Sequence, residues 1–168
     1  MSRKIRYANL ADSDILGRIH SEASQAGFKD IIPDDVLNEV FSIQRRTKRF
    51  ISELTEGSPR TAIIFEKNEP AGLISFGKCR YSNNDNSWIE IWRVYLAQKF
   101  WGSGAAKELM EWGINEILSE NFANIELWVL EENIRAIKFY EKMGFKHDNT
   151  VQTANMGIEL KELRYIKV

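Results

Sequence analysis

The sequence predicts a single domain of mixed α/β class that spans residues 1–168. Three observations support this prediction. Short apolar runs typical of strands alternate with amphipathic segments typical of helices, and no repeat, low-complexity tract or linker interrupts them. Hydrophobic residues make up 43% of the 168 residues, which is enough for a substantial core. The expected order of elements is β-α-α-β-β-β-α-β-α-β-β.

The first third of the chain predicts one strand and two helices. Residues 4–8 alternate polar and apolar side chains and should form a strand. The segment 12–26 has helical periodicity, and Asp12 or Ser13 can cap its start. A proline opens a second helix over residues 33–55, with or without a break inside it.

The middle of the chain predicts three strands. Residues 61–66 and 71–78 form a β-hairpin around the turn 67–70, and a polar loop follows at 82–87. The run 88–96 (WIEIWRVYL) carries apolar residues on both faces. We therefore expect it to be a central strand that is covered on each side.

The last part of the chain alternates helices and strands. A helix over 102–118 shows a buried stripe, a strand follows at 125–130, and a strong helix covers 133–143. The C-terminal portion predicts two more strands, which include 156–161 and 165–168.

Charge and composition exclude several functions. The chain has 23 basic and 24 acidic residues and a net charge of −1, so a nucleic acid partner is not expected. No apolar stretch approaches the roughly 20 residues of a membrane helix, and the polar N-terminus is not a signal peptide. The single cysteine, Cys79, excludes an internal disulfide and favours a cytoplasmic location. His20 and His147 lack metal-ligand spacing, so no metal site is expected.

A glycine-containing segment, Trp101-Gly102-Ser103-Gly104-Ala105-Ala106, separates the predicted central strand from the long helix. Two glycines let the backbone approach a ligand closely, and the helix start offers unpaired N–H groups with a partial positive charge. Together these features suit a phosphate group. The spacing matches neither a nucleotide P-loop nor a dinucleotide fingerprint. A tight turn without a ligand would need the same glycines, so both interpretations stay open.

The helix that Asn133 starts carries a second candidate surface. Asn133 and Tyr140 are seven residues apart and lie on one helical face, with Ala136 and Ile137 between them. This stripe could cover a long amphipathic ligand. Asn133 can also serve as the helix cap, and Tyr140 can instead be a core aromatic residue whose hydroxyl reaches a partner.

Together, the two segments resemble the GNAT superfamily of acetyl-CoA-dependent N-acetyltransferases. The family's loop Gln/Arg-Gly-x-Gly-x-Gly/Ala is matched from Trp101 to Ala106, although Trp101 replaces the usual Gln or Arg. The family's signature Asn-x-x-Ala-x-x-Phe-Tyr-x-x-x-Gly-Phe is matched in full by Asn133, Ala136, Phe139, Tyr140, Gly144 and Phe145. The resemblance covers nearly the whole chain. It implies a GNAT-like α+β fold with a mixed, mostly antiparallel central sheet flanked by helices.

The resemblance also implies acetyl-CoA as the cosubstrate, and it assigns residues to it. The backbone of Val94, Tyr95 and Leu96 would pair with the pantetheine arm. A backbone N–H near Val94 would face the thioester carbonyl. Asn133 would contact the arm, and Tyr140 would lie beside the sulfur. The pyrophosphate would be held by the backbone amides of Gly102, Ser103, Gly104, Ala105, Ala106 and Lys107.

Two side chains are candidates for proton transfer. An amine reacts as the free base, yet a lysine-like amine has a pKa near 10.4, so a base or a water relay must take its proton. Glu90 is the candidate base, and the alternative is a surface glutamate paired with Lys78 or Arg80. Tyr140 is expected to donate a hydrogen bond to the leaving thiolate. Cys79 is expected to be a packed thiol rather than a nucleophile.

The predicted reaction is direct attack of a primary amine, on a small molecule or a peptide, on the thioester of acetyl-CoA. The alternative is a non-catalytic acyl-CoA-binding regulatory protein on the same fold. Asp30, Asp34 and Asp35 could attract a cationic acceptor, although carboxylates at a helix start need no such role. The expected partners are this amine acceptor and, as one option, a second copy in a homodimer; neither nucleic acid nor a membrane is expected.

Overall fold

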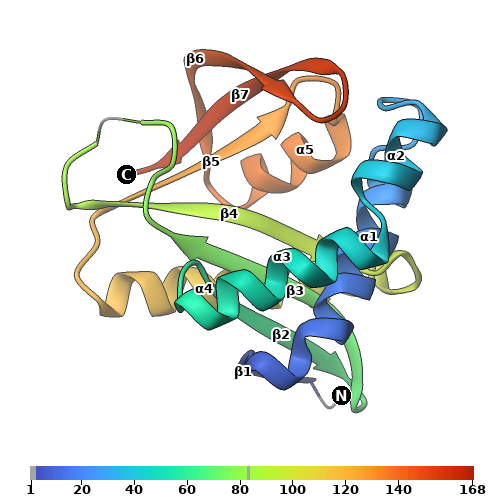
Figure 1. Cartoon of the computed structure of the whole chain (residues 1–168). Helices are drawn as coiled ribbons and strands as arrows, with labels where there is room; N and C mark the ends of the chain where they lie inside the picture. The colour runs from blue at the N-terminus through green and yellow to red at the C-terminus, as the bar shows by residue number, and fades with distance from the viewer. Residues whose placement is uncertain (1–2, 83) are drawn as a thin grey trace.

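The computed structural model describes residues 3–82 and 84–168, and these form a seven-stranded sheet with helices on both faces (Figure 1). In chain order the elements are β1 (Arg3–Tyr7), the 3₁₀ helix η1 (Leu10–Asp12), α1 (Ser13–Gly27), α2 (Asp34–Val40), α3 (Ile43–Glu56), β2 (Arg60–Glu66), β3 (Glu69–Gly77), β4 (Trp88–Leu96), the 3₁₀ helix η2 (Gln98–Phe100), α4 (Ala105–Ser119), β5 (Asn124–Leu130), α5 (Ile134–Lys142), β6 (Lys146–Asn155) and β7 (Glu159–Lys167). Met1 and Ser2, at the N-terminus predicted to lack a signal peptide, and Asn83, in the predicted polar loop, lie outside the described residues.

The strands lie in the order β1-β2-β3-β4-β5-β7-β6. Every neighbouring pair is antiparallel except β4 and β5, which are parallel. The predicted fold class, a mixed and mostly antiparallel sheet flanked by helices, is therefore confirmed. The predicted central strand over 88–96 is also confirmed, because β4 has these bounds and lies in the middle of the sheet.

The sheet splits between β4 and β5. These two strands pair only over Trp88–Glu90 with Asn124–Glu126. Beyond Glu90 they diverge, as Figure 1 shows by the V that opens between them. The rest of β4 still pairs with β3 along its other edge. The split therefore leaves one edge of β4 without a neighbouring strand from Ile91 to Leu96.

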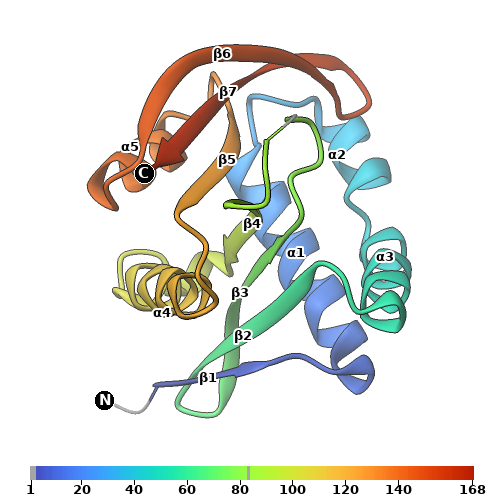
Figure 2. The ribbon, with the colours of Figure 1, turned by 90° about the vertical axis from the view of Figure 1, so that its left-hand side faces the viewer.

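Helices cover the two faces of the sheet differently (Figure 2). In that view α1 and α3 lie on one side of β1–β4, and α4 lies on the other. Leu16, Ile19 and Phe50 pack α1 and α3 onto β2 and β3. Leu109, Met110 and other apolar residues of α4 form the larger cluster on the opposite face. Each fully buried side chain of this size stabilises the fold by about 1.5–3 kcal/mol.

The break that the prediction left open in the helix over 33–55 is present. It separates α2 from α3, because the Ser42 hydroxyl accepts a hydrogen bond from the Arg45 N–H and starts a new helix. Two other element boundaries differ from the prediction. The helix predicted over 102–118 begins only at Ala105, since Gly102 and Gly104 adopt left-handed φ values of 77° and 90°. The hairpin turn is also shorter than predicted. It consists of Lys67 and Asn68, whose φ values are both positive.

The predicted C-terminal strands, 156–161 and 165–168, were wrong in their bounds. Residues 159–167 form one continuous strand, β7, and its partner β6 starts at Lys146. β6 is an edge strand of mostly polar residues, KHDNTVQTAN, so it shows little hydrophobic alternation. The residues between, including Gly157 with φ 87°, make the turn of the hairpin.

Candidate functional site

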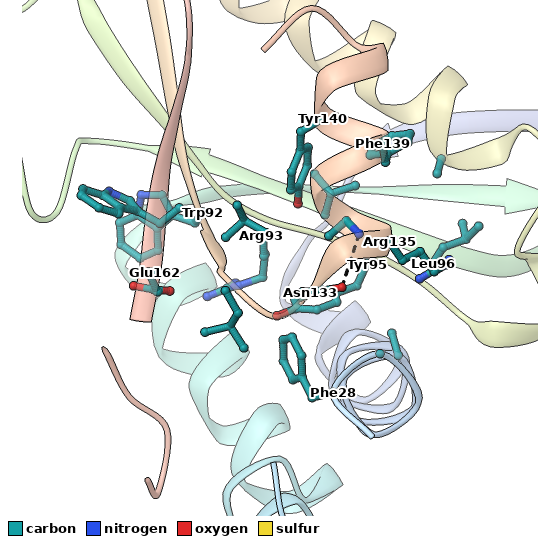
Figure 3. Close-up of a pocket in the computed structure, with 18 of the residues that line it drawn as sticks. Phe28, Trp92, Arg93, Tyr95, Leu96, Asn133, Arg135, Phe139, Tyr140 and Glu162 are labelled. Atoms are coloured by element: carbon teal, nitrogen blue, oxygen red, sulfur yellow. Dashed lines mark hydrogen bonds between the residues drawn. The ribbon is translucent and has the colours of Figure 1, made fainter. Parts of the chain in front are cut away.

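A cavity of about 990 Å³ passes through the split between β4 and β5, and we call it the through-sheet cavity. On the α4 side, its wall includes the loop before α4 and the face of α5 that carries Tyr140. On the α1 side, its wall includes His20, Phe28 and Phe41. A ligand in this cavity could therefore contact groups from both faces of the sheet. Figure 3 shows α5 and β4 contributing side chains to the same space.

The end of β4 supplies unpaired backbone to the cavity. Val94, Tyr95 and Leu96 line it, on the edge that β5 has left. The register with β3 slips by one residue at Trp92, which is a β-bulge two positions before Val94. Backbone groups at a free strand edge can pair with an extended ligand as another strand would.

The loop before α4 offers free backbone amides. Among the described residues, the N–H groups of Gly102, Gly104, Ala106 and Lys107 have no backbone acceptor, and all four residues line the cavity. The other two predicted members of this loop do not line it. Ser103 directs its carbonyl oxygen to Arg3, whose Nη2 lies 2.6 Å away. Ala105 is fully buried in the core. Four free amides at a helix start form a site that favours an anion.

Trp101, the departure from the family pattern, ties this loop to β4. Its indole Nε1 donates a hydrogen bond of 2.8 Å to the carbonyl oxygen of Leu96. The guanidinium carbon of Arg135 lies 3.4 Å from the centre of the indole ring, which is a close cation–π contact. The tryptophan therefore occupies one carbonyl of the β4 edge and holds an arginine of α5 at the cavity wall.

The helix α5 places Asn133 and Tyr140 in the cavity wall, as their shared face predicted. The Asn133 side chain caps α5 by accepting a hydrogen bond of 3.3 Å from the Ala136 N–H. The Tyr140 hydroxyl points into the cavity toward β4 (Figure 3). Burial, and secondarily the neighbouring Tyr95, raises the pKa of Tyr140. Tyr140 is therefore a neutral hydrogen-bond donor at neutral pH.

Glu90 does not line the through-sheet cavity. Its side chain is fully buried, and one of its oxygens accepts a 2.6 Å hydrogen bond from Nη2 of Arg80. The backbone N–H of Arg80 donates a second hydrogen bond, of 2.9 Å. Burial raises the pKa of Glu90, and the charge of Arg80 partly opposes this rise. Arg80 itself lines the cavity, so Glu90 is separated from the cavity by its arginine partner.

The α1 side of the cavity contains polar residues that sequence reasoning did not assign. His20 is buried there, and its Nδ1 lies 3.0 Å from the Ser24 hydroxyl. Burial is the main cause that lowers the pKa of His20 well below its usual value, so the imidazole is neutral. Arg46 and Glu162 also line this side. These residues come from α1, α3 and β7, so no sequence spacing links them.

Two further predictions concern residues outside the cavity. Asp30, Asp34 and Asp35 are exposed and do not line it. Burial raises the pKa of the Cys79 thiol to about 12, which disfavours a reactive thiolate.

Within residues 3–82 and 84–168, no cluster of His, Cys, Asp or Glu could hold a metal ion. In the same ranges, no helix is long and apolar enough to cross a membrane.

The sequence and fold match known proteins. Residues 28–145 match a family model described as the Acetyltransferase (GNAT) family. The chain is 26% identical over 161 residues to the uncharacterized N-acetyltransferase YuaI of Bacillus subtilis, covering 95% of this chain and 89% of that protein. It is 23% identical over 104 residues to the spermine/spermidine N(1)-acetyltransferase of B. subtilis, covering 60% of this chain and 68% of that protein.

The fold is also similar to solved structures. The PaiA N-acetyltransferase of Thermoplasma acidophilum, solved in complex with coenzyme A, superposes with a TM-score of 0.77. The alignment covers 99% of each chain at 18% sequence identity. At this identity the likeness shows the fold alone.

Proposed function

Because this chain belongs to the acetyltransferase (GNAT) family, we propose that it transfers the acetyl group of acetyl-CoA to a primary amine of a small molecule or peptide. The observation that carries the proposal is the through-sheet cavity. The cavity extends from the loop of free amides at the start of α4, along the unpaired edge of β4, to the polar residues on the α1 side. In such a space, a thioester with a long, phosphate-bearing arm can enter from the α4 side of the sheet. An amine can reach the thioester from the α1 side.

The residues on the α4 side fit acetyl-CoA. The free amides of Gly102, Gly104, Ala106 and Lys107 would bind the pyrophosphate. The free edge of β4 at Val94 and Tyr95 would pair with the amide groups of the pantetheine arm. Of the two side chains predicted on α5, Asn133 would contact this arm, and Tyr140 would lie beside the sulfur. Bound acetyl-CoA supplies an activated acetyl group.

Three groups that were predicted to bind acetyl-CoA would contribute to its binding less directly: Ser103, Ala105 and the carbonyl of Leu96. Ser103 would position the loop through its contact with Arg3, and Ala105 would pack the start of α4 onto the sheet. The Leu96 carbonyl is held by Trp101, so its contact with the arm would compete with the indole N–H.

Negative charge develops first on the carbonyl oxygen and then on the leaving sulfur. A backbone N–H of β4 near Val94 would stabilise the oxygen, because the β-bulge at Trp92 changes the direction in which the following backbone groups of β4 point. Tyr140 would donate a hydrogen bond to the sulfur. A thiol has a pKa near 8.5 and a tyrosine near 10, so full proton transfer from Tyr140 is uphill. Burial raises the pKa of Tyr140 further, which favours hydrogen bonding over transfer.

The amine must lose a proton before or during attack. We propose that Glu90 is the ultimate proton acceptor, reached through a water relay past Arg80 rather than by direct contact with the amine. The support is that Glu90 is a buried carboxylate with a raised pKa, behind a residue of the cavity wall. Its contact with Arg80 equally suits a structural role, and a glutamine variant separates the two, as described below.

The test is release of free CoA thiol from acetyl-CoA in the presence of a panel of primary amines. The proposal predicts amine-dependent thiol release above the rate without amine, with an N-acetylated product identified by mass spectrometry. Tight CoA binding without turnover on any amine would instead favour the alternative, a non-catalytic acyl-CoA-binding regulator. Binding is measured separately as the shift in melting temperature that CoA produces.

A further inference from the structure

On the α1 side of the through-sheet cavity, Arg46 has no carboxylate partner. Arg46, near the start of α3, lines the cavity beside Phe41, with its guanidinium carbon 5.6 Å from the ring centre. Among the described residues no carboxylate lies within ion-pair distance of it. Its Nε is buried and has no hydrogen-bond acceptor. The residue as a whole is half-buried, and a partly buried guanidinium without a carboxylate partner favours an anion supplied by a ligand.

The neighbouring arginines are each paired with a carboxylate. Arg93 contacts both oxygens of Glu53 at 2.7 and 2.8 Å, and Arg49 adds a third contact to the same carboxylate at 2.9 Å. Arg80 is paired with Glu90. Because Glu53 is shared by two other arginines, it does not neutralise Arg46. Burial, and then the charge of Arg93, lowers the pKa of Arg46.

A second unpaired donor lines the same cavity. The indole Nε1 of Trp128, on β5, is buried and has no acceptor among the described residues. Its ring contacts Tyr81 edge-to-face, with centroids 6.3 Å apart. Buried N–H donors without partners are rare, because leaving one unsatisfied costs about 1–3 kcal/mol. Arg46 and Trp128 therefore border the cavity, each has an N–H group that lacks an acceptor, and both of these nitrogen atoms are themselves covered.

One carboxylate lines the cavity among the described residues, that of Glu162 on β7. It accepts a hydrogen bond of 2.9 Å from Gln152. Figure 3 shows Glu162 and Trp92 at the end of the cavity away from Arg135 and Leu96. An acceptor's ammonium group would be attracted to this carboxylate, while its anionic group would be attracted to Arg46.

We propose that the acceptor is a small primary amine that also carries a carboxylate, and that Arg46 binds this carboxylate. The inference rests on the proposed function and names the substrate class for it. On the α1 side, a single unpaired guanidinium matches the single charge of a carboxylate better than the two charges of a phosphate. A polyamine is disfavoured, because the α1 side of the cavity presents the unpaired Arg46 and, among the described residues, only one carboxylate, that of Glu162.

The test compares matched pairs of acceptors. L-amino acids and their C-terminal amides are assayed by release of free CoA thiol, with spermidine and phosphoethanolamine in the same panel. We expect kcat/KM to be about 10- to 100-fold higher for the carboxylate of each productive pair, the range for a hydrogen-bonded charge. The amide's amino group is the more easily deprotonated of the two, so ionisation of the amine cannot produce this preference. Preference for the amides, spermidine or phosphoethanolamine would overturn the inference.

A variant pair assigns the effect to Arg46. Arg46→Gln should lower kcat/KM for the carboxylate-bearing amine about 10- to 100-fold and leave the amide nearly unchanged. The control is Arg45→Gln, since Arg45 is exposed and contacts Glu39 instead of the cavity. It should behave as wild type. An equal loss on both acceptors in Arg46→Gln would overturn the inference.

Binding without turnover provides an independent measurement. An N-acetyl-L-amino acid and its amide are titrated into the CoA-saturated protein, and the acid should bind about 10-fold or more tightly. Equal binding, or binding of neither, would overturn the inference even if some amine is acetylated. Failure of the protein to bind CoA at all is a different result, because it would overturn the proposed function and the inference that rests on it.

Discussion

At the scale of single residues, Tyr140 is the side chain whose position is most informative. Its hydroxyl points into the cavity, and none of the hydrogen bonds found among the described residues engages it. A tyrosine that served only core packing would normally satisfy its hydroxyl with a partner. The free hydroxyl therefore fits a group that acts on a ligand.

Tyr140→Phe should lower kcat and kcat/KM together by about 10²-fold, because the lost hydrogen bond is made mainly to the developing thiolate. CoA affinity should stay nearly unchanged. Single-turnover kinetics, with CoA binding measured alongside, tests this expectation. Tyr165→Phe is the matched control, since Tyr165 is a buried tyrosine whose hydroxyl contacts Glu141 at 3.4 Å, outside the cavity. A wild-type rate in Tyr140→Phe would remove Tyr140 from the mechanism.

Glu90→Gln should lower turnover most at low pH. The raised pKa of Glu90 means that its base form is lost at a higher pH than for an ordinary carboxyl group. Without the base, only amine that is already deprotonated reacts, and that fraction falls tenfold per pH unit below the amine pKa. The measurement is the pH dependence of kcat/KM from pH 6 to 9.

Glu126→Gln is the control for Glu90. Glu126 is equally buried, lies opposite Glu90 on β5 and is paired with Arg164 at 2.7 Å. Both variants should lose stability, because each breaks a buried ion pair. Only Glu90→Gln should change the pH profile. If its profile matches that of wild type, Glu90 only holds Arg80 in place.

His20 makes stability depend on pH. Its pKa in the folded state is well below 6.5, so the folded protein binds fewer protons than the unfolded chain. Stability is therefore lost as pH falls through about 6.5, the unfolded value. Between pH 7.5 and 5.5, urea unfolding should show that wild type loses about 1 kcal/mol more than His20→Gln. Equal losses in the two proteins would show that the fold does not lower the pKa of His20.

The place of the residues inside the sequence signature in the cavity wall could be predicted from the sequence, whereas that of the residues on the α1 side of the cavity could not. Asn133 and Tyr140 share a helical face, so their spacing alone predicted a common surface. Arg46 and Glu162 come from elements far apart in sequence. Only the packing of α3 and β7 around the split brings them into one cavity, and no local pattern encodes that packing.

At the scale of elements, the loop before α4 depends on backbone conformation. Gly104 has φ 90°, a value that costs a side-chain-bearing residue about 1–3 kcal/mol. Its free amide and its place in the cavity wall follow from that conformation. The sequence predicted a helix that included both glycines, because propensity does not locate the first helical residue; their use in phosphate binding stays a prediction.

Gly104→Val should abolish CoA binding while the protein stays folded. Gly57→Val is the matched control: Gly57 has φ 79° at the end of α3, and an added Cβ would meet no atom within 4 Å. Both variants should lose similar stability, about 1–3 kcal/mol, from the same backbone strain. Calorimetric titration with CoA should then show normal affinity in Gly57→Val alone. Normal affinity in Gly104→Val would mean that the loop does not bind the cofactor.

At the scale of the whole molecule, the split in the sheet determines where a ligand can lie. The apolar character of β4 predicted a central strand, and this was confirmed. The three-residue register with β5 could not be predicted, because pairing between strands separated by a long helix is set by tertiary packing. The polar edge strand β6 was missed for a related reason, since an exposed edge needs no hydrophobic alternation.

The central claim is that acetyl-CoA binds along the split, with its phosphates at α4 and its sulfur at Tyr140. The most direct test is a crystal structure of the protein with CoA. We expect the pyrophosphate on the free amides of the loop at Gly102–Lys107 and the arm hydrogen-bonded to the edge of β4. The sulfur should lie within hydrogen-bond distance of the Tyr140 hydroxyl. CoA bound elsewhere, or paired with neither β4 nor this loop, would contradict the claim.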